Sequence, residues 1–362
     1  MFPTSYNEIL ALVDEIDPVK YAYNRNYIDG NVTRLSPYIS RGVISTIFVY
    51  ERLQQRGFKL WQIEKFVQEL AWRDYWQLIW CNEGDKIDKD LKAPQLNVRS
   101  KEMPEAMLLA NTGISAIDEG IKTLMSTGYI HNHVRMYLAA VVCNVAQCNW
   151  ERAAQWMYYH LLDADWASNA LSWQWVAGTN SNKKYYANQE NINKYCYTND
   201  SNTFLDKSYE ELMMLTVPEQ LSKTAIPELI TVLPPKQPVN IHPDKPLLIY
   251  NFYNLDPLWR KEFDANRVLL LEPSVFEKYP LAQHTIDFVL KLSENITGIQ
   301  VCTGEFSELS NGFNHDKIYF KEHPLNSHYH GNYDERDWLT PVKGNFPSFF
   351  SYWRKAKPYL QK

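Results

Sequence analysis

The sequence predicts an all-α region followed by a small α/β region. Apolar residues recur at helical spacing from residue 5 to about residue 197, and alternation of period two is almost absent there. Six prolines then fall between Pro227 and Pro246, which predicts an extended connector. Beyond them, apolar runs of strand length alternate with helix candidates, a pattern typical of a parallel sheet. We therefore expect a helical domain over 1–198, a connector over 199–245 and an α/β domain over 246–362.

The helical region contains two segments with strong periodicity. Over 63–80, Phe66 and Leu70 form one four-residue step, and a second row consists of Trp72, Trp76 and Trp80. The other segment, 131–146, follows a Thr-Gly turn. Both segments are predicted to be helices.

The connector and the α/β region come next. Within the connector, 209–215 is a candidate for one short helix. Strands are predicted at four apolar runs: PLLIYNF (246–252), RVLLLEP (267–273), GIQVCTG (298–304) and DKIYFKE (316–322). Helices are predicted at 257–263, where Asp256 is the N-cap residue, and at 285–295.

Composition excludes several classes of protein. The chain has 37 basic and 42 acidic residues, a net charge of −5, which argues against a strongly basic nucleic-acid binder. No apolar run reaches the ~18 residues of a membrane helix, and the amino-terminal segment lacks the pattern of a secretion peptide. Five cysteines without a CxxC pair predict neither a disulfide framework nor an iron–sulfur cluster. We expect a cytoplasmic protein without a membrane partner. An aromatic content of 14% suggests aromatic binding surfaces as well as core.

A candidate charged site lies in the helical region. Arg135 belongs to the segment TGYIHNHVRM (127–136), and Asp163 and Asp165 follow in LLDADWASNALSWQW (161–175). An arginine that faces inward from an apolar helix needs an anion, because burying it unpaired costs several kcal/mol. A structural salt bridge and a ligand site are both compatible with this spacing. Neither phosphate-binding glycine loop, GxGxxG or GxxxxGK[ST], occurs in the chain.

Four strings in the helical region resemble the FAD-binding domain of the photolyase/cryptochrome family. They are RLSPYISRGVIS (34–45), ELAWRDYW (69–76), TGYIHNHVRM (127–136) and NWERAAQWMYYHLLDADWASNALSWQW (149–175). Their order and spacing match the family, and no gap is needed from Gly113 to Trp175. The resemblance implies an all-α, photolyase-like FAD-binding catalytic domain over 1–198.

The resemblance also implies a set of FAD-binding residues. Hydroxyl and guanidinium groups would donate hydrogen bonds to the phosphates and ribityl chain; the matching positions are Tyr21, Thr33, Arg34, Ser36 and Arg73. Leu35 is a further matching position of the FAD-binding segment. Asp163 and Asp165 would bind the flavin ring and pair with Arg135. Asn169 would face flavin N5, where an amide accepts a hydrogen bond from the N5 proton and helps hold the flavin reduced. Val32 departs from the family, which usually has Thr there.

A second implied set would contact a flipped cyclobutane pyrimidine dimer: Glu69, Trp72, Asn132, His133 and Met136. Glu69 would share a hydrogen bond with a thymine carbonyl, and Trp72 would stack on the extruded bases. A core role is the alternative for Trp72. His133 stands where the family has Arg, which removes a fixed cation. Asn132 and Met136 stand where 6-4 photolyases have paired histidines, so a cyclobutane dimer is the expected lesion.

The tryptophan chain that reduces the flavin in the family is matched in part. Trp173 and Trp150 match its first two members, and Asn97 stands at the third position. Either a neighbouring Tyr or Trp takes that place, or photoreduction is slow. Trp175 is expected to be a core residue.

The α/β region stands in an unusual order. In the family an α/β antenna domain precedes the FAD domain, whereas in this chain a Rossmann-like α/β region follows it. LLLEPSVFEKYP (269–280) and DWLTPVKGNFPSFFSYW (337–353) resemble antenna-domain segments. The arrangement resembles a class of short, topologically rearranged photolyases associated with lesions in single-stranded DNA. No fingerprint specifies a second antenna chromophore.

The sequence therefore predicts a light-dependent DNA repair lyase, a cyclobutane pyrimidine dimer photolyase. The resemblance implies that excited reduced FAD donates an electron to the dimer. It also implies that the partner is UV-damaged DNA, single strands included. We expect the protein to be a monomer. Two alternatives stay open: a cryptochrome-like blue-light photoreceptor without repair activity, and a flavoprotein with a structural role. A metal site at His323, His328 and His330 is not expected, because their spacing matches no common zinc motif.

Overall fold

The computed structural model describes residues 2–361. The chain divides into two compact units: the sheet unit, residues 2–19, 33–82 and 230–361, and the helical unit, residues 20–32 and 83–229. This grouping differs from the predicted domains because amino-terminal helices pack with the α/β region. Tyr6 N donates to Asn295 Oδ1 at 2.8 Å, and Leu255 N donates to Arg41 O at 2.9 Å.

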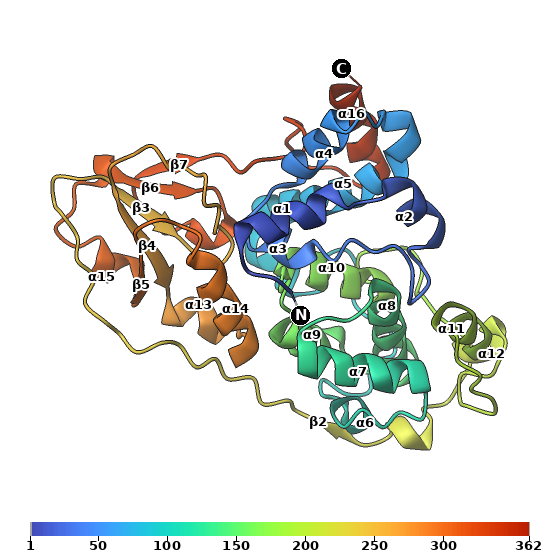
Figure 1. Ribbon diagram of the computed structural model, residues 1–362. Helices are drawn as coiled ribbons and strands as arrows, with labels where there is room; N and C mark the ends of the chain where they lie inside the picture. The colour runs from blue at the N-terminus through green and yellow to red at the C-terminus, as the bar shows by residue number, and fades with distance from the viewer. Residues whose placement is uncertain (1, 362) are drawn as a thin grey trace. The chain divides into compact units, whose positions relative to one another are not determined.

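The sheet unit contains five helices outside its α/β part (Figure 1). They are α1 (Tyr6–Asp14), α3 (Ser36–Ser40), α4 (Thr46–Gln55), α5 (Leu60–Glu83) and α16 (Phe349–Leu360). The predicted helix over 63–80 is confirmed as α5, which extends further at both ends. Asp74 of α5 is fully buried and accepts hydrogen bonds from Thr46 Oγ1 (3.0 Å) and Leu339 N (2.6 Å). These bonds fasten α4 and the segment before α16 to α5, and burial raises the pKa of Asp74.

Five parallel strands form the sheet, in the order β5-β4-β3-β6-β7. They are β3 (Leu247–Tyr250), β4 (Asn266–Leu271), β5 (Ile299–Thr303), β6 (Ile318–Lys321) and β7 (Asn332–Asp334). Leu247 lies opposite both Asn266 and Ile318, so the three central strands start level. The four predicted strands and the parallel sheet are confirmed. β7 was not predicted because its three residues are polar and largely exposed.

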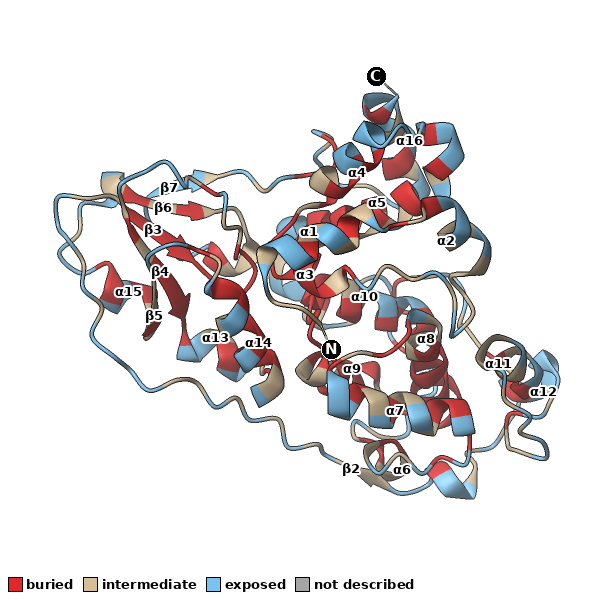
Figure 2. Cartoon of the chain, viewed as in Figure 1, coloured by how far each residue is buried: buried red, intermediate tan, exposed pale blue. Residues whose placement is uncertain are grey.

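Helices and loops cover both faces of this sheet. α15 (Phe306–Leu309) and Tyr329 pack on one face, against a core that includes Ile249, Val268 and Phe320. α13 (Pro273–Lys278) and α14 (Gln283–Ser293) lie along the other side (Figure 1). β3 and β4 are mostly red in Figure 2, because central strands are buried on both faces. This explains why they read as continuous apolar runs in the sequence.

The helical unit is built from short and medium helices. They are α6 (Glu105–Leu108), α7 (Ser115–Thr127), α8 (Asn132–Ala140), α9 (Trp150–His160), α10 (Trp166–Ala177), α11 (Gln189–Cys196) and α12 (Tyr209–Met213). The predicted helix over 131–146 is α8 continued by a π-helical segment, Val141–Val145. β1 (Met103–Pro104) pairs antiparallel with β2 (Thr224–Ala225), and α12 confirms the short helix in the connector. α2 (Pro18–Asn24) contributes residues to both units.

Short 3-10 helices complete the secondary structure. They are η1 (Gly84–Asp88), η3 (Glu219–Leu221), η4 (His315–Lys317) and η5 (Pro324–Asn326). No helix within 2–361 is both long and apolar enough to cross a membrane.

The helix predicted over 257–263 is wrong, because this segment forms turns. Asp256 Oδ1 does accept a hydrogen bond from Leu258 N at 2.8 Å, as an N-cap would. Arg260, however, has a left-handed backbone (φ 47°), and its guanidinium bonds to both carboxylate oxygens of Asp334 at 2.6 and 2.8 Å. This tertiary ion pair with β7 outweighs the local helix preference.

Candidate functional site

An ion pair between a half-buried arginine and a buried carboxylate lies in the helical unit, between α8 and the loop before α10. Arg135 Nη1 is 3.1 Å from Asp163 Oδ2, and Arg135 Nε donates to Ile130 O at 3.0 Å. The Arg135 side chain is 21% exposed and the Asp163 side chain 7%. The structure therefore brings together the arginine and the first carboxylate that the sequence had singled out.

Asp165 and Asn169 stand one turn apart at the start of α10. Asp165 caps the helix, since its Oδ1 accepts a hydrogen bond from Ser168 N at 3.0 Å. Asn169 donates its Nδ2 to Ala154 O of α9 at 2.8 Å. Both side chains are buried. Because the amide nitrogen of Asn169 is engaged, its Oδ1 is the atom that can accept a hydrogen bond from a ligand.

Three further predicted residues lie on α8. Asn132 is exposed, whereas His133 and Met136 are half-buried. The His133 ring lies 5.0 Å from the ring of Tyr195. Burial, assisted by the charge of Arg25, lowers the pKa of His133. The imidazole is therefore neutral near pH 7 and does not supply the cation that an arginine would.

The predicted phosphate-binding residues are divided between the two units. Thr33, Arg34, Leu35, Ser36 and Arg73 belong to the sheet unit. Arg34 has a left-handed backbone (φ 54°) and an exposed side chain, whereas Leu35 is buried. Arg73 Nη1 donates to Ser40 Oγ at 2.8 Å and thereby connects α5 to α3. Tyr21, on α2, belongs to the helical unit, where the Arg25 guanidinium lies 5.9 Å from its ring.

Glu69 and Trp72 lie on α5 in the sheet unit. Glu69 Oε1 is 3.6 Å from Lys65 Nζ, and its side chain is 34% exposed. The Trp72 ring stacks on Phe349 of α16, with centroids 3.9 Å apart and an interplanar angle of 9°. One face of the indole is thus covered by the chain itself. Sequence reasoning missed Phe349, because only the packing of α16 on α5 makes it a neighbour.

The two matched tryptophans are buried in the helical unit. Trp173 and Trp150 are 2% and 0% exposed, and Trp150 Nε1 donates to Asp90 Oδ1 at 2.8 Å. Asn97 is exposed with φ 59°, a left-handed conformation that Asn adopts more readily than Trp. The expected core role of Trp175 is wrong: it is 39% exposed and its ring lies 5.8 Å from that of Tyr185.

The carboxyl edge of the sheet offers little room for a cofactor. The strand order reverses between β3 and β6, and open α/β sheets bind ligands at such a point. The cavity there measures about 40 Å³, against the ~300–1,000 Å³ of cofactor pockets. Tyr253 and His323 stack in it with centroids 4.1 Å apart, and the Arg41 guanidinium lies 5.0 Å from the Tyr253 ring.

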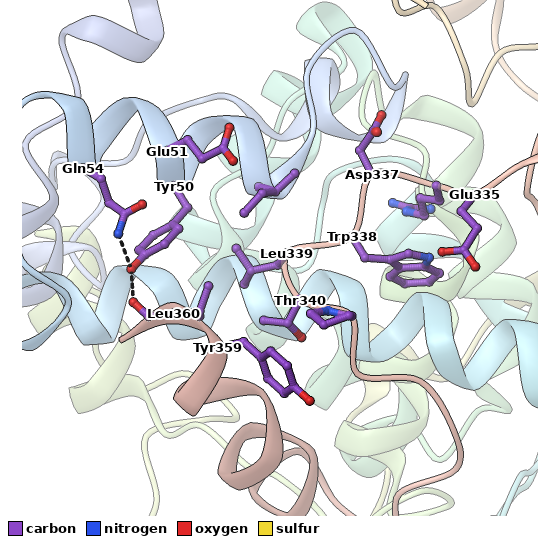
Figure 3. A pocket seen from close by; sticks show the side chains of 13 residues that line it. Tyr50, Glu51, Gln54, Glu335, Asp337, Trp338, Leu339, Thr340, Tyr359 and Leu360 are labelled. Carbon is purple, nitrogen blue, oxygen red and sulfur yellow. Dashed lines mark hydrogen bonds between the residues drawn. The ribbon is translucent and has the colours of Figure 1, made fainter. Parts of the chain in front are cut away.

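A larger cavity, about 580 Å³, lies in the sheet unit between α4, α16 and 335–341 (Figure 3). Gln54 donates its amide to Tyr50 Oη at 3.0 Å, and Tyr50 donates to Leu360 O. None of the predicted site residues lines this cavity.

The histidines considered as metal ligands have other partners. His328 Nε2 lies 2.8 Å from Glu272 Oε1, and His315 stacks on His330 with centroids 5.7 Å apart. Within 2–361 the structure holds no cluster of three His, Cys, Asp or Glu side chains suited to a metal ion.

Comparison with known proteins relates the helical part of the chain to a family. Residues 66–221 match the FAD binding domain of DNA photolyase. A deoxyribodipyrimidine photo-lyase of Alkalihalophilus pseudofirmus is 29% identical over 171 residues, and one of Thermus thermophilus is 30% identical over 164. These matches cover 46% and 44% of this chain but only 36% and 38% of the relatives. An archaeal photolyase structure from Sulfolobus tokodaii is 29% identical, with a TM-score of 0.46 over 54% of this chain and 45% of that one.

Proposed function

We propose that this protein binds FAD and is a light-dependent cyclobutane pyrimidine dimer photolyase, because residues 66–221 match the FAD binding domain of DNA photolyase. The single observation that carries the proposal is this match, which includes Glu69, Arg135, Asp163 and Asn169. We also propose that the protein is a monomer and that it is cytoplasmic. Its five free cysteines fit a reducing compartment.

The buried polar groups of the helical unit fit a flavin ring. Asp163 and Asp165 offer carboxylate oxygens to ring N–H groups, and Arg135 offers donors to ring carbonyl oxygens while it neutralises Asp163 at 3.1 Å. Asn169 offers Oδ1 to the N5 proton, since its nitrogen is held by Ala154 O.

FAD, when bound, reduced and excited by light, supplies the electron that splits the dimer. The protein's own residues hold the cofactor and the substrate. The carboxyl group of Glu69, in its protonated form, would donate a hydrogen bond to a thymine carbonyl. Trp72, which is half-buried and also lies 4.9 Å from the ring of Trp76, would stack on the extruded bases with the part of its indole that stays accessible.

We further propose that single-stranded DNA is the preferred substrate. A net charge of −5 favours a mode of binding that depends less on phosphate contacts than duplex binding does. Stacking on aromatic side chains contributes ~1–3 kcal/mol per base, and a dimer in a single strand need not be unpaired before it is flipped.

The experiment separates flavin binding from repair. Asp163→Asn should lower the FAD content of the purified protein. Glu69→Ala should keep the wild-type flavin spectrum but slow the repair of a thymine dimer, and Glu277→Ala, an exposed acid on α13, is the matched control. Loss of yellow colour in Glu69→Ala to the same degree as in Asp163→Asn would contradict these separate roles.

A photoreceptor without repair activity is the second candidate. The neutral His133 in place of a fixed cation and the exposed Asn97 in place of a tryptophan favour it. Stoichiometric FAD with no repair of either single-stranded or duplex substrate would support this candidate.

A further inference from the structure

The segment 338–362 differs in charge from the rest of the chain. It contains five basic residues and no Asp or Glu, although the whole chain has a net charge of −5. It also contains seven aromatic residues: Trp338, Phe346, Phe349, Phe350, Tyr352, Trp353 and Tyr359. Basic side chains interleaved with aromatic rings are typical of surfaces that bind single-stranded nucleic acid.

Part of this segment forms a hollow of about 580 Å³ on the sheet unit. It is lined by Val342, Lys343, Phe346, Lys355, Pro358 and Tyr359. The last three stand at positions i, i+3 and i+4 of α16 and therefore share one face of the helix. The lining holds two ammonium groups and two aromatic rings but no carboxylate.

The charge available in the hollow is that of Lys355. Lys343 Nζ is already 3.1 Å from Glu322 and 3.8 Å from Glu335. Lys355 is exposed, and its Nζ lies 5.5 Å from the centre of the Phe346 ring. Within the described chain no carboxylate pairs with Lys355 or with its neighbour Arg354. An anion at this place would meet an uncompensated cation.

Tyr359 lines both this hollow and a second cavity. The ring is 51% exposed and also lines the cavity in Figure 3, where Glu51, Glu335 and Asp337 supply three carboxylates. That cavity is also lined by Arg336, and its Asp337 is paired with Lys321 at 2.6 Å. Lys355 is therefore the cation of this region to which a phosphate is attracted. Tyr359 is half exposed, and part of its ring can therefore meet a base.

We propose that this hollow binds one stretch of single-stranded DNA, with a base on Tyr359 and a phosphate at Lys355. The inference rests on the proposed function and deepens it, because it places part of the DNA strand on α16, the helix that covers one face of Trp72. The same helix carries Phe349, whose ring stacks on Trp72. α16 therefore connects the residue proposed to stack on the lesion with the hollow.

Binding of an undamaged, fluorescently labelled oligothymidylate to the full chain tests the proposal by anisotropy. Tyr359→Ala should weaken binding at least about fivefold, since one base–ring stack is lost. Lys355→Gln should reduce the slope of log affinity against log salt by about 0.7, the value for one phosphate contact on a single strand. Tyr333→Ala (63% exposed) and Lys278→Gln (exposed), both in the sheet unit, are matched controls and should bind like wild type.

The outcomes distinguish this inference from the proposed function. Wild-type affinity and salt slope in both test variants, with unchanged thermal melting, would overturn the hollow as a binding site even if the wild type repairs dimers. The proposal would also be overturned if the control variants weakened oligonucleotide binding equally, or if the test variants changed duplex binding and its salt slope to the same degree. If the wild type repairs nothing but binds the oligonucleotide, and Tyr359→Ala and Lys355→Gln weaken that binding, the result would support the hollow and reject the photolyase.

Discussion

Asn169 is held in a fixed orientation in the proposed flavin site, because its amide nitrogen donates to Ala154 O at 2.8 Å. Asn169→Ala removes the acceptor for the N5 proton while Arg135 and both carboxylates stay in place. We expect FAD to remain bound, and the reduced flavin to reoxidise in air about two- to tenfold faster, the equivalent of one hydrogen bond. In the control variant Ser168→Ala, which changes the neighbouring residue, the reduced flavin should reoxidise at the wild-type rate. Identical rates in Asn169→Ala and wild type would remove Asn169 from the site.

His133 predicts a pH dependence of stability. Its pKa in the folded protein lies below the ~6.5 of the unfolded chain, because it is half-buried and near Arg25. Above pH ~6.5 His133 is neutral in both the folded and the unfolded protein, and it does not reduce the free energy of unfolding. Below that pH the unfolded state binds the proton first, so the free energy of unfolding falls by up to ~1.4 kcal/mol per pH unit until the folded pKa is reached.

Urea titrations at several values between pH 5 and 7.5 measure this effect. His133→Gln should flatten the dependence, whereas His242→Gln, at an exposed position, should not. In both variants His323 should still contribute to the fall of unfolding free energy with decreasing pH, since burial lowers its pKa well below the usual value. A His133→Gln slope equal to that of wild type would contradict this assignment.

At the scale of elements, the turn after α3 depends on one glycine. Gly42 has φ 66°, and a Cβ built there would lie 2.4 Å from Tyr253 O and 3.1 Å from Asn254 Cα. Gly42→Ala should therefore destabilise the protein by several kcal/mol, since backbone atoms on both sides must move. Gly57→Ala is the control: φ is 90° but the space is open, so only backbone strain of ~1–2 kcal/mol is expected. Equal losses in urea denaturation would show that the contact with Tyr253 is unimportant.

The elements that the sequence predicted are those whose information is local. The central strands are buried on both faces and appear as apolar runs, and α5 and α8 show helical periodicity. The segment 257–263 was mispredicted because Asp334, far along the chain, captures Arg260. The pairing of Arg135 with Asp163 could be anticipated from spacing and resemblance. The cover that Phe349 places on Trp72 could not, because it depends on where α16 packs.

At the scale of the whole molecule, the sheet unit is assembled from three separate stretches of the chain. Tyr38 of α3 packs against Phe288 of α14, with ring centroids 6.0 Å apart. Trp80 of α5 contacts His323, with centroids 5.0 Å apart. These aromatic residues near the amino terminus have their partners beyond residue 230.

A fragment ending at residue 229 should therefore not fold as the full chain does. It retains Tyr38 and Trp80 without their partners, and exposing such rings costs ~1.5–3 kcal/mol each. We expect a broad, noncooperative thermal transition by circular dichroism and rapid proteolysis within 33–82. A cooperative transition at the melting temperature of the full chain would show that the helical region is autonomous, as the predicted domain over 1–198 implies.

Light-dependent repair is the measurement that tests the central claim most directly. The purified protein, with its flavin reduced, is illuminated with an oligonucleotide that contains one thymine dimer, as a single strand and as a duplex. The account predicts recovery of the ultraviolet absorbance of intact thymines, faster for the single strand and absent in the dark. FAD-loaded, reduced protein that restores neither substrate in the light would contradict it.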